Sequence, residues 1–122
     1  MQHTSQIGVS PIRKEGWDKV TGNAKYTGDT LPKDILHGRI LTSLYAHALI
    51  KEIDISQAKK SKGVKALIRG EYLPALTGSM ISDRPPIAWD RVRYYGEPIA
   101  LVVADSEENA MAGVNLIKVE YQ

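Results

Sequence analysis

The stretch Ile99-Ala-Leu-Val-Val-Ala104 is a run of six apolar residues around which the rest of the chain can be placed. A strand with one solvated face alternates apolar and polar side chains, whereas an unbroken apolar run is typical of a strand buried on both faces. The turn Gly96-Glu-Pro98 comes directly before it, and its proline fixes φ at the entry to the run. We therefore predict that residues 99–104 form the centre of the core.

The residues that follow carry the signals of a helix and then a strand. Asp105 and Ser106 are N-cap residues, and the two glutamates after them place negative charge where the helix dipole favours it. The helix is predicted to bury one stripe of side chains, formed by Ala110, Met111, Val114 and Ile117. Residues 117–121 then alternate apolar and charged side chains, which predicts a strand with one apolar face formed by Ile117, Val119 and Tyr121.

Period-two alternation predicts three further strands upstream. In the first, residues 36–43, one face carries Leu36, Gly38, Ile40 and Thr42, and the other carries His37, Arg39, Leu41 and Ser43. In residues 49–55 the predicted shared face is Leu49, Ile53 and Ile55, with Ile50 as an exception. In residues 64–69 one face carries Val64, Ala66 and Ile68, and the other carries Lys65, Leu67 and Arg69.

Shorter segments connect these strands. Ser56 is predicted to cap a short helix through Lys62, and Gly63 suits the left-handed conformation after it. Residues 73–88 have no clear period and are predicted to be a surface loop, and residues 91–95 a short strand.

The chain divides into an N-terminal arm and one domain. Residues 1–34 are polar and rich in glycine and proline, which predicts an extended arm. Residues 35–122 are predicted to be a single domain of the α+β class, with a mixed sheet of five or six strands and two helices in the order βαβ then ββαβ. A strand at the extreme C-terminus is also what a cut between domains looks like, so we expect a piece of a longer subunit.

Composition excludes several classes of chemistry. The 122 residues contain no cysteine, so this chain alone offers no disulfide, thiolate nucleophile or iron–sulfur ligand. The net charge of +2 is too small to indicate a nucleic-acid or membrane partner. Since the sequence has neither a long apolar run nor the features of a signal peptide, we expect a cytoplasmic protein.

The histidines do not form a catalytic or metal-binding pattern. His3 lies near the terminus, and the spacing of His37 and His47 matches no metal motif. Ser43 and His47 are close in sequence, but there is no G-x-S-x-G motif around the serine, so a structural role is favoured over nucleophilic catalysis.

Other candidate sites are equally incomplete. No two glycines lie closer than six residues apart, so no phosphate-binding loop is present. The carboxylates of Asp83, Asp90 and Glu97 could form an acid/base pair but are expected to bind turn amides. A basic cluster could contact RNA, but it lacks interleaved aromatic residues and is better explained as a solvated surface; it consists of Lys59, Lys60, Lys62, Lys65 and Arg69. No catalytic, cofactor-binding or metal-binding residue is therefore expected in this chain.

Three blocks of sequence resemble one family. They are Lys19-Val-Thr-Gly-Asn-Ala-Lys-Tyr26, then Leu36-His-Gly-Arg-Ile-Leu-Thr-Ser43 with Ala46-His-Ala48, and Val92-Arg-Tyr-Tyr-Gly-Glu-Pro-Ile-Ala100. Together with residues 107–121 they are similar to the N-terminal α/β hammerhead domain of the large, molybdopterin-binding subunit of xanthine dehydrogenases, aldehyde oxidases and carbon monoxide dehydrogenases. Departures are Thr42 and Leu44, where the family usually has arginine and proline, and Gly113 and Asn115, which lower helix propensity.

The resemblance implies a function for a parent enzyme rather than for these residues. The parent would hydroxylate purines, related heteroaromatics or aldehydes, as in purine catabolism, with water as the oxygen source. Its molybdopterin, iron–sulfur and flavin cofactors would lie on other domains or subunits, which are the implied partners. We therefore expect a scaffold domain of such an enzyme; the alternatives are a free-standing interaction module and a weak RNA binder.

Overall fold

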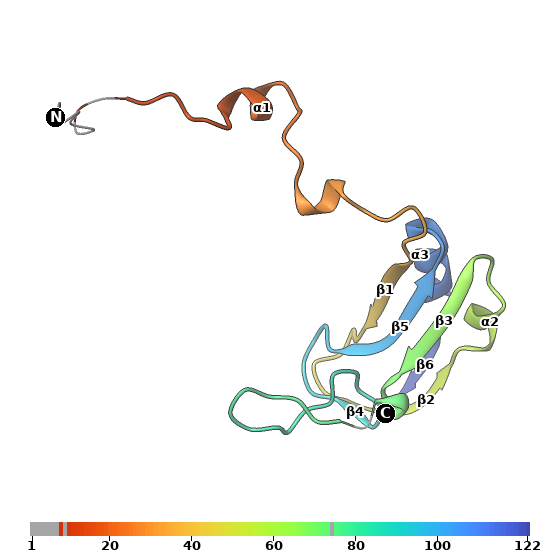
Figure 1. Ribbon diagram of the computed structural model, residues 1–122. Helices are drawn as coiled ribbons and strands as arrows, with labels where there is room; N and C mark the ends of the chain where they lie inside the picture. Colours follow the sequence, from red (N-terminus) through yellow and green to blue (C-terminus); the bar gives the residue numbers. More distant parts are fainter. Residues whose placement is uncertain (1–7, 9, 74) are drawn as a thin grey trace. The chain divides into compact units, whose positions relative to one another are not determined.

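The computed structural model describes residues 8, 10–73 and 75–122, and the chain divides into two units after Lys33. The second unit contains two three-stranded sheets (Figure 1). One has the order β1-β5-β3, built from β1 (His37–Thr42), β5 (Pro98–Ala104) and β3 (Val64–Arg69). The other has the order β4-β2-β6, built from β4 (Arg91–Val92), β2 (Ala48–Asp54) and β6 (Lys118–Tyr121).

The predicted single mixed sheet is wrong, because every strand pairing among the described residues is antiparallel and the strands fall into two sheets. The chain leaves β5 through helix α3 (Glu107–Asn115) and enters β6, which pairs with β2 in the other sheet instead of returning beside β5. Alternation in the sequence identifies strands but does not determine which strands pair, so it could not predict this topology.

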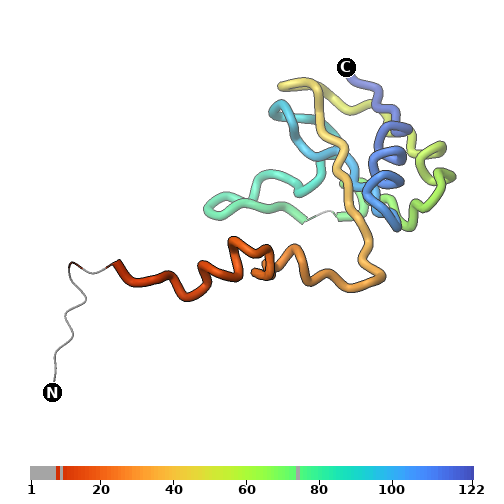
Figure 2. Tube along the Cα trace, turned by 90° about the horizontal axis from the view of Figure 1, so that it is seen from above, coloured from red at the N-terminus to blue at the C-terminus, as the bar shows by residue number. Residues whose placement is uncertain are grey.

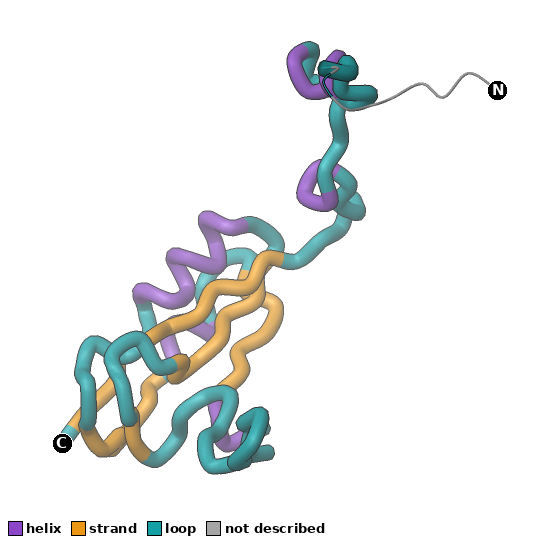
Figure 3. Tube along the Cα trace, turned by 90° about the vertical axis from the view of Figure 1, so that its left-hand side faces the viewer, coloured by secondary structure: helices purple, strands orange, loops and turns teal. Residues whose placement is uncertain are grey.

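Strand β5 is the central strand of the first sheet, as predicted. It pairs with β1 on one edge and β3 on the other, and its Ile99, Ala100, Val102 and Ala104 are fully buried. Leu101 and Val103 are only half-buried. Helix α3 runs along one side of these strands (Figure 3), so burial on both faces is incomplete in this chain.

Two strands change face through a bulge. In β2 the pairing shifts between Ile50 and Glu52, and this bulge lets Ala48 and Ile50 before it, and Ile53 after it, all pack on the core. Leu49, which the alternation placed on the core face, is 41% exposed. The apparent exception at Ile50 is therefore a core residue, and the assignment of Leu49 to the core is corrected.

Strand β3 has a similar shift between Val64 and Ala66. Val64 and Leu67 pack against the core as a result, although an ideal strand would place them on opposite faces. A single extra residue thus reverses the predicted alternation in each of these strands.

Helix α3 begins as predicted and approaches the sheet through a glycine. The Ser106 hydroxyl accepts a hydrogen bond from the Asn109 backbone N–H at 3.2 Å. Ala110, Val114 and the following Ile117 are buried, but Met111 is 37% exposed and Gly113 is buried instead. A Cβ at Gly113 would lie 2.9 Å from Val102 Cγ1 and 3.1 Å from Val64 Cγ2, so a glycine allows the helix to pack this closely.

The C-terminal strand pairs as the sequence predicted. Figure 2 shows the blue C-terminal segment following directly from α3. Val119 and Tyr121 are half-buried against the core, and beyond β6 the Gln122 N–H donates to Leu49 O at 2.9 Å.

Helix α2 (Ser56–Lys59) is shorter than predicted, and Ser56 is its first residue rather than its N-cap. The Asp54 carboxylate accepts from the Ser56 N–H at 2.8 Å, and this hydrogen bond lowers the pKa of Asp54. Gly63, just after the helix, has φ +76°, as expected for its left-handed position.

The first unit contains a short helix, α1 (Gly16–Val20), and a 3₁₀ turn, η1 (Thr27–Asp29). A second 3₁₀ turn, η2 (Gly70–Tyr72), follows β3 in the second unit. No helix in the described part of the chain is both long and apolar enough to cross a membrane.

We predict that Val102→Asp unfolds the second unit. Val102 is 0% exposed, and an unpaired carboxylate there costs several kcal/mol against a total stability of about 5–15 kcal/mol. Thermal denaturation followed by circular dichroism measures this, with Ile40→Asp as a control on the same sheet because Ile40 is half-exposed. A cooperative transition of Val102→Asp at the wild-type temperature would contradict the assignment of β5 to the core.

We predict that Gly113→Ala destabilises the protein, although alanine is the better helix former. The gain in propensity is about 1 kcal/mol, and overpacking against Val102 and Val64 costs about 1–3 kcal/mol. A double-mutant cycle with Val102→Ala, measured by denaturant unfolding, should remove most of the penalty. Stabilisation by Gly113→Ala alone would show that the helix does not pack this closely.

Candidate functional site

Two buried polar side chains stand out among the described residues, Ser43 and Glu97, each 1% exposed. Ser43 follows β1 and Glu97 precedes β5, so the two lie in neighbouring turns at one end of the first sheet. Their backbones are linked directly, because the Ser43 N–H donates to Glu97 O at 2.9 Å and the Gly96 N–H donates to Ser43 O at 2.9 Å. We call this pair of turns the Ser43–Glu97 clasp.

The side chains of the clasp are used within it. The Ser43 hydroxyl donates to Tyr45 O at 2.9 Å and accepts from the Tyr45 N–H at 3.0 Å. Glu97 Oε2 accepts from the Arg93 N–H, and Glu97 Oε1 lies 3.7 Å from Arg93 Nη1 without a hydrogen bond. The clasp therefore organises two turns with hydrogen bonds, and its serine is not arranged as a nucleophile with a base.

An aromatic pair borders the clasp, formed by the half-buried Tyr121 and the exposed Tyr45. The rings of Tyr45 and Tyr121 have centroids 4.9 Å apart and are tilted by 58°. Burial raises the pKa of the Tyr121 phenol, and a hydrogen bond with the Ser43 side chain acts in the opposite direction. The phenol therefore stays neutral and packs against the Tyr45 ring.

The histidines do not come together in a site. His37 is half-buried on β1, His47 is exposed in the turn before β2, and His3 lies outside the described residues. Within the described ranges, no three side chains of His, Asp or Glu are grouped so that they could hold a metal ion.

Two of the candidate carboxylates share one arginine, because Arg93 Nη2 donates to Asp90 Oδ1 at 3.4 Å and Arg93 Nη1 lies 3.7 Å from Glu97 Oε1. Asp90 Oδ1 accepts from the Arg91 N–H at 2.7 Å, and Glu97 binds the Arg93 N–H, so the expectation that they bind turn amides is confirmed for both. Asp83 is exposed in the loop after Gly78. No hydrogen bond joins any two of these three carboxylates.

The basic cluster is divided by its neighbours. Lys65 lies 3.9 Å from Asp105, and Arg69 donates to Glu71 Oε2 at 2.8 Å while its guanidinium lies 5.4 Å from the Tyr72 ring centre. Acidic side chains thus interrupt the positive surface, which is unlike a continuous nucleic-acid-binding stripe.

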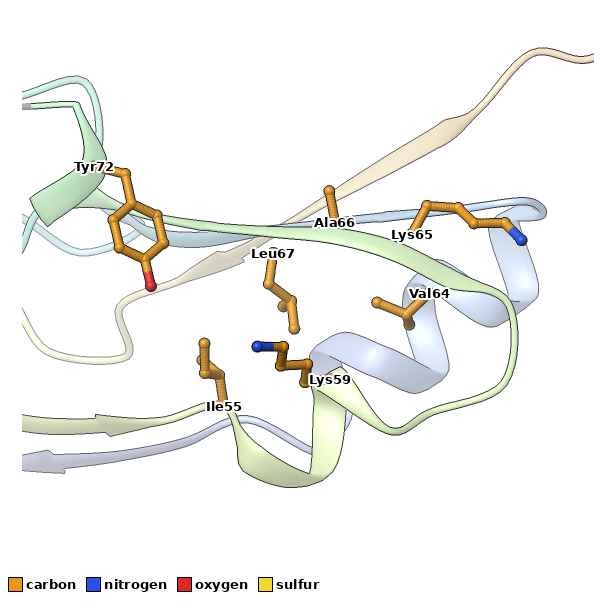
Figure 4. Close-up of a pocket in the computed structure, with 7 residues that line it drawn as sticks. All are labelled: Ile55, Lys59, Val64, Lys65, Ala66, Leu67 and Tyr72. Carbon is orange, nitrogen blue, oxygen red and sulfur yellow. The ribbon is translucent and has the colours of Figure 1, made fainter.

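A hollow of about 240 Å³ lies between α2 and β3 (Figure 4). Ile55, Val64 and Leu67 form its apolar wall, the Lys59 ammonium lies between Ile55 and Leu67, and Tyr72 lines one end. It is smaller than the roughly 300–1,000 Å³ of ordinary ligand pockets, and no polar groups converge in it. We infer no small-molecule site there.

The described residues do not fit a molybdopterin cofactor. Its pyrophosphate would need several backbone N–H groups pointing at one place, as in a glycine-rich loop. The glycines with positive φ, Gly8, Gly22, Gly63, Gly78 and Gly96, are dispersed along the chain. We therefore derive no catalytic step from this chain.

The chain is similar in sequence to proteins of one family. Residues 21–122 match the family model described as "Aldehyde oxidase and xanthine dehydrogenase, a/b hammerhead domain". The chain is 42% identical over 115 residues to a probable xanthine dehydrogenase subunit from Bacillus subtilis, covering 93% of this chain and 15% of that protein. It is 30% identical over 118 residues to the nicotinate dehydrogenase large molybdopterin subunit of Eubacterium barkeri, covering 95% of this chain and 28% of that protein.

Solved structures give the same result. Quinoline 2-oxidoreductase from Pseudomonas putida 86 has a TM-score of 0.83 at 31% identity, over 94% of this chain and 16% of that one. Reconstituted CO dehydrogenase from Oligotropha carboxidovorans has a TM-score of 0.85 at 28% identity, over 94% of this chain and 15% of that one. The match covers nearly all of this chain but only a small part of each relative. The chain therefore belongs to the aldehyde oxidase and xanthine dehydrogenase family, as its α/β hammerhead domain.

Proposed function

We propose that this chain is a scaffold and assembly domain of a molybdenum-dependent hydroxylase. The observation that carries the proposal is a packed hammerhead core whose buried polar groups, Ser43 and Glu97, are both used to hold turns together. In this proposal residues 35–122 are the domain, residues 1–34 are an extended arm, and both belong to a longer subunit that spans several times this length, as the Bacillus subtilis relative does.

The chemistry of the parent enzyme would lie outside these residues. It would hydroxylate a purine, a related heteroaromatic compound or an aldehyde, with molybdopterin held by other domains of the same subunit. Names of the relatives support a multi-subunit assembly, since they include a xanthine dehydrogenase subunit, a large molybdopterin subunit and the gamma subunit of a dehydrogenase complex. Iron–sulfur and flavin groups would be carried by partner subunits. We further propose that the complex is cytoplasmic. Purine catabolism is its first candidate role.

We predict that the isolated chain holds no stoichiometric molybdenum, iron or zinc and oxidises neither hypoxanthine nor aldehydes. The reason is that the sequence has no cysteine thiolate, and that the positive-φ glycines of the described residues are too dispersed to gather N–H donors around a pyrophosphate. A chimera in which residues 21–122 replace the matching segment of the Bacillus subtilis relative should hold molybdenum. Elemental analysis and dye reduction measure both proteins.

The control is the same Bacillus subtilis protein with the segment deleted, which should lose molybdenum. A molybdenum content that is equal in the chimera and in the deletion variant would contradict the scaffold role. One molybdenum per isolated chain, with turnover, would place the active site in this domain and contradict the proposal entirely.

We predict that Glu97→Ala lowers the free energy of unfolding by about 1–3 kcal/mol, because the Arg93 N–H loses its buried acceptor. Glu97→Gln keeps an acceptor oxygen at nearly the same volume and should cost less. Glu120→Ala, at an exposed position on β6, is the control and should change stability by no more than about 0.5 kcal/mol. Denaturant unfolding measures all three, and equal losses for Glu97→Ala and Glu120→Ala would show that the clasp contributes nothing.

A further inference from the structure

The first sheet has an apolar face that helix α3 does not cover. Residues paired across antiparallel strands point to the same side, and two rows of pairs can be followed across the sheet. One row joins Ile40, Leu101 and Ile68, and the next joins Gly38, Val103 and Ala66. We call these six residues the outer face.

The other side of the same strands is the covered one. Val102 and Val64 lie against Gly113 of α3, and Leu67 packs on the core. In Figure 4 the Ala66 side chain points away from Leu67 and the hollow beneath it. The outer face is therefore opposite to α3.

Within the second unit the outer face is open and uncharged. Ile40 is 50% exposed, Gly38 and Ala66 are exposed, and the other three residues are half-buried. All six residues are apolar or glycine. A contiguous apolar surface of this kind on a folded domain marks an interaction site, and the absence of cations on it is unlike a surface for nucleic acid or anionic lipid.

One end of this side of the sheet is already used for packing within the chain. The Ala88 N–H donates to Pro98 O at 2.8 Å, and the backbone of Ile87 lies against Gly70, directly after β3. Ile99 lies at the start of β5, at the register shift where Leu41 pairs with Ala100 and Thr42 pairs with Pro98, and it is 0% exposed. Full burial is thus confined to the start of β5, whereas Leu101 and Val103 on the outer face are half-buried.

We propose that the outer face is the docking surface for the remainder of the same molybdopterin-binding subunit, through an apolar surface of one of its other domains. This inference rests on the proposed function, since it requires a longer subunit. The argument for this occupant is that the relatives carry most of their length outside the matched segment, 85% of it in the Bacillus subtilis protein (100% minus the 15% covered). A covalently continuous domain is present at high effective concentration, so a modest apolar surface is sufficient to bind it.

The test uses the absence of cysteine from this chain. Ile40→Cys places a single thiol on the outer face, and Lys60→Cys places one at an exposed position after α2 as a matched control. Each variant is made in the isolated chain and in the Bacillus subtilis chimera. Alkylation by a maleimide is followed over time by mass spectrometry of the labelled peptide.

In the isolated chain we expect the two thiols to react at similar rates. In the chimera, labelling of Ile40→Cys should slow by about tenfold or more, while Lys60→Cys stays fast, because only the outer face becomes covered. In a second variant, Ile40→Lys, the melting temperature of the isolated chain should change little, and the molybdenum content of the chimera should fall.

Three results would overturn the proposal. A molybdenum-containing chimera that labels Ile40→Cys at the rate of the isolated chain would show that the domain assembles through another surface, leaving the proposed function intact. Slow labelling of Ile40→Cys in the isolated chain that depends on protein concentration would identify a second copy as the occupant. A chimera that holds no more molybdenum than the deletion variant would contradict the proposed function. The docking proposal for the outer face would then fail with it.

Discussion

The pairing of β5 with two neighbours at once is the constraint on which the rest of the structure depends. Both edges of β5 are hydrogen-bonded, one to β1 and the other to β3. Its side chains therefore point only to the two faces of the sheet. Val102 faces α3, where Gly113 lets the helix approach, and Ile99 is buried where the loop containing Ile87 and Ala88 reaches the sheet. Because the strand is apolar on both sides, each side needs a cover, and the described residues of the second unit cover one side fully and the other at one end.

The second sheet depends on the first through α3 and the two bulges. The helix carries the chain across from β5 to β6, and β6 then pairs with β2. The shifts in β2 and β3 turn Ile53 and Leu67 toward the shared core, which strict alternation would not allow together with Ile50 and Val64. Each bulge costs a local irregularity in pairing and is offset by the burial of another apolar side chain.

The two buried polar side chains organise turns and are not arranged as a catalytic pair. The Ser43 and Glu97 side chains are removed from water and bind backbone groups within their own turns. Two backbone hydrogen bonds, from Ser43 N–H to Glu97 O and from Gly96 N–H to Ser43 O, hold the ends of β1 and β5 together. A catalytic group would instead be directed into a pocket with a partner and free to exchange a proton. Family membership and geometry therefore fit a domain that supports a site formed by other parts of a larger protein, as we propose.

The sequence by itself determined the central strand, the capped helix after it, the C-terminal strand and, through three motif blocks, the family. These features depend on local signals: an apolar run, an N-cap at Ser106 and alternation in residues 117–121. Only the tertiary structure decided that the strands form two antiparallel sheets, that Ile50 rather than Leu49 faces the core, and that Gly113 rather than Met111 is buried. The physical reason is that strand partners, bulges and the distance between a helix and a sheet are set by contacts between residues far apart in the chain. The outer face is likewise a feature that only the tertiary structure decided, because Ile40, Ile68 and Leu101 become neighbours only when β1, β5 and β3 pair.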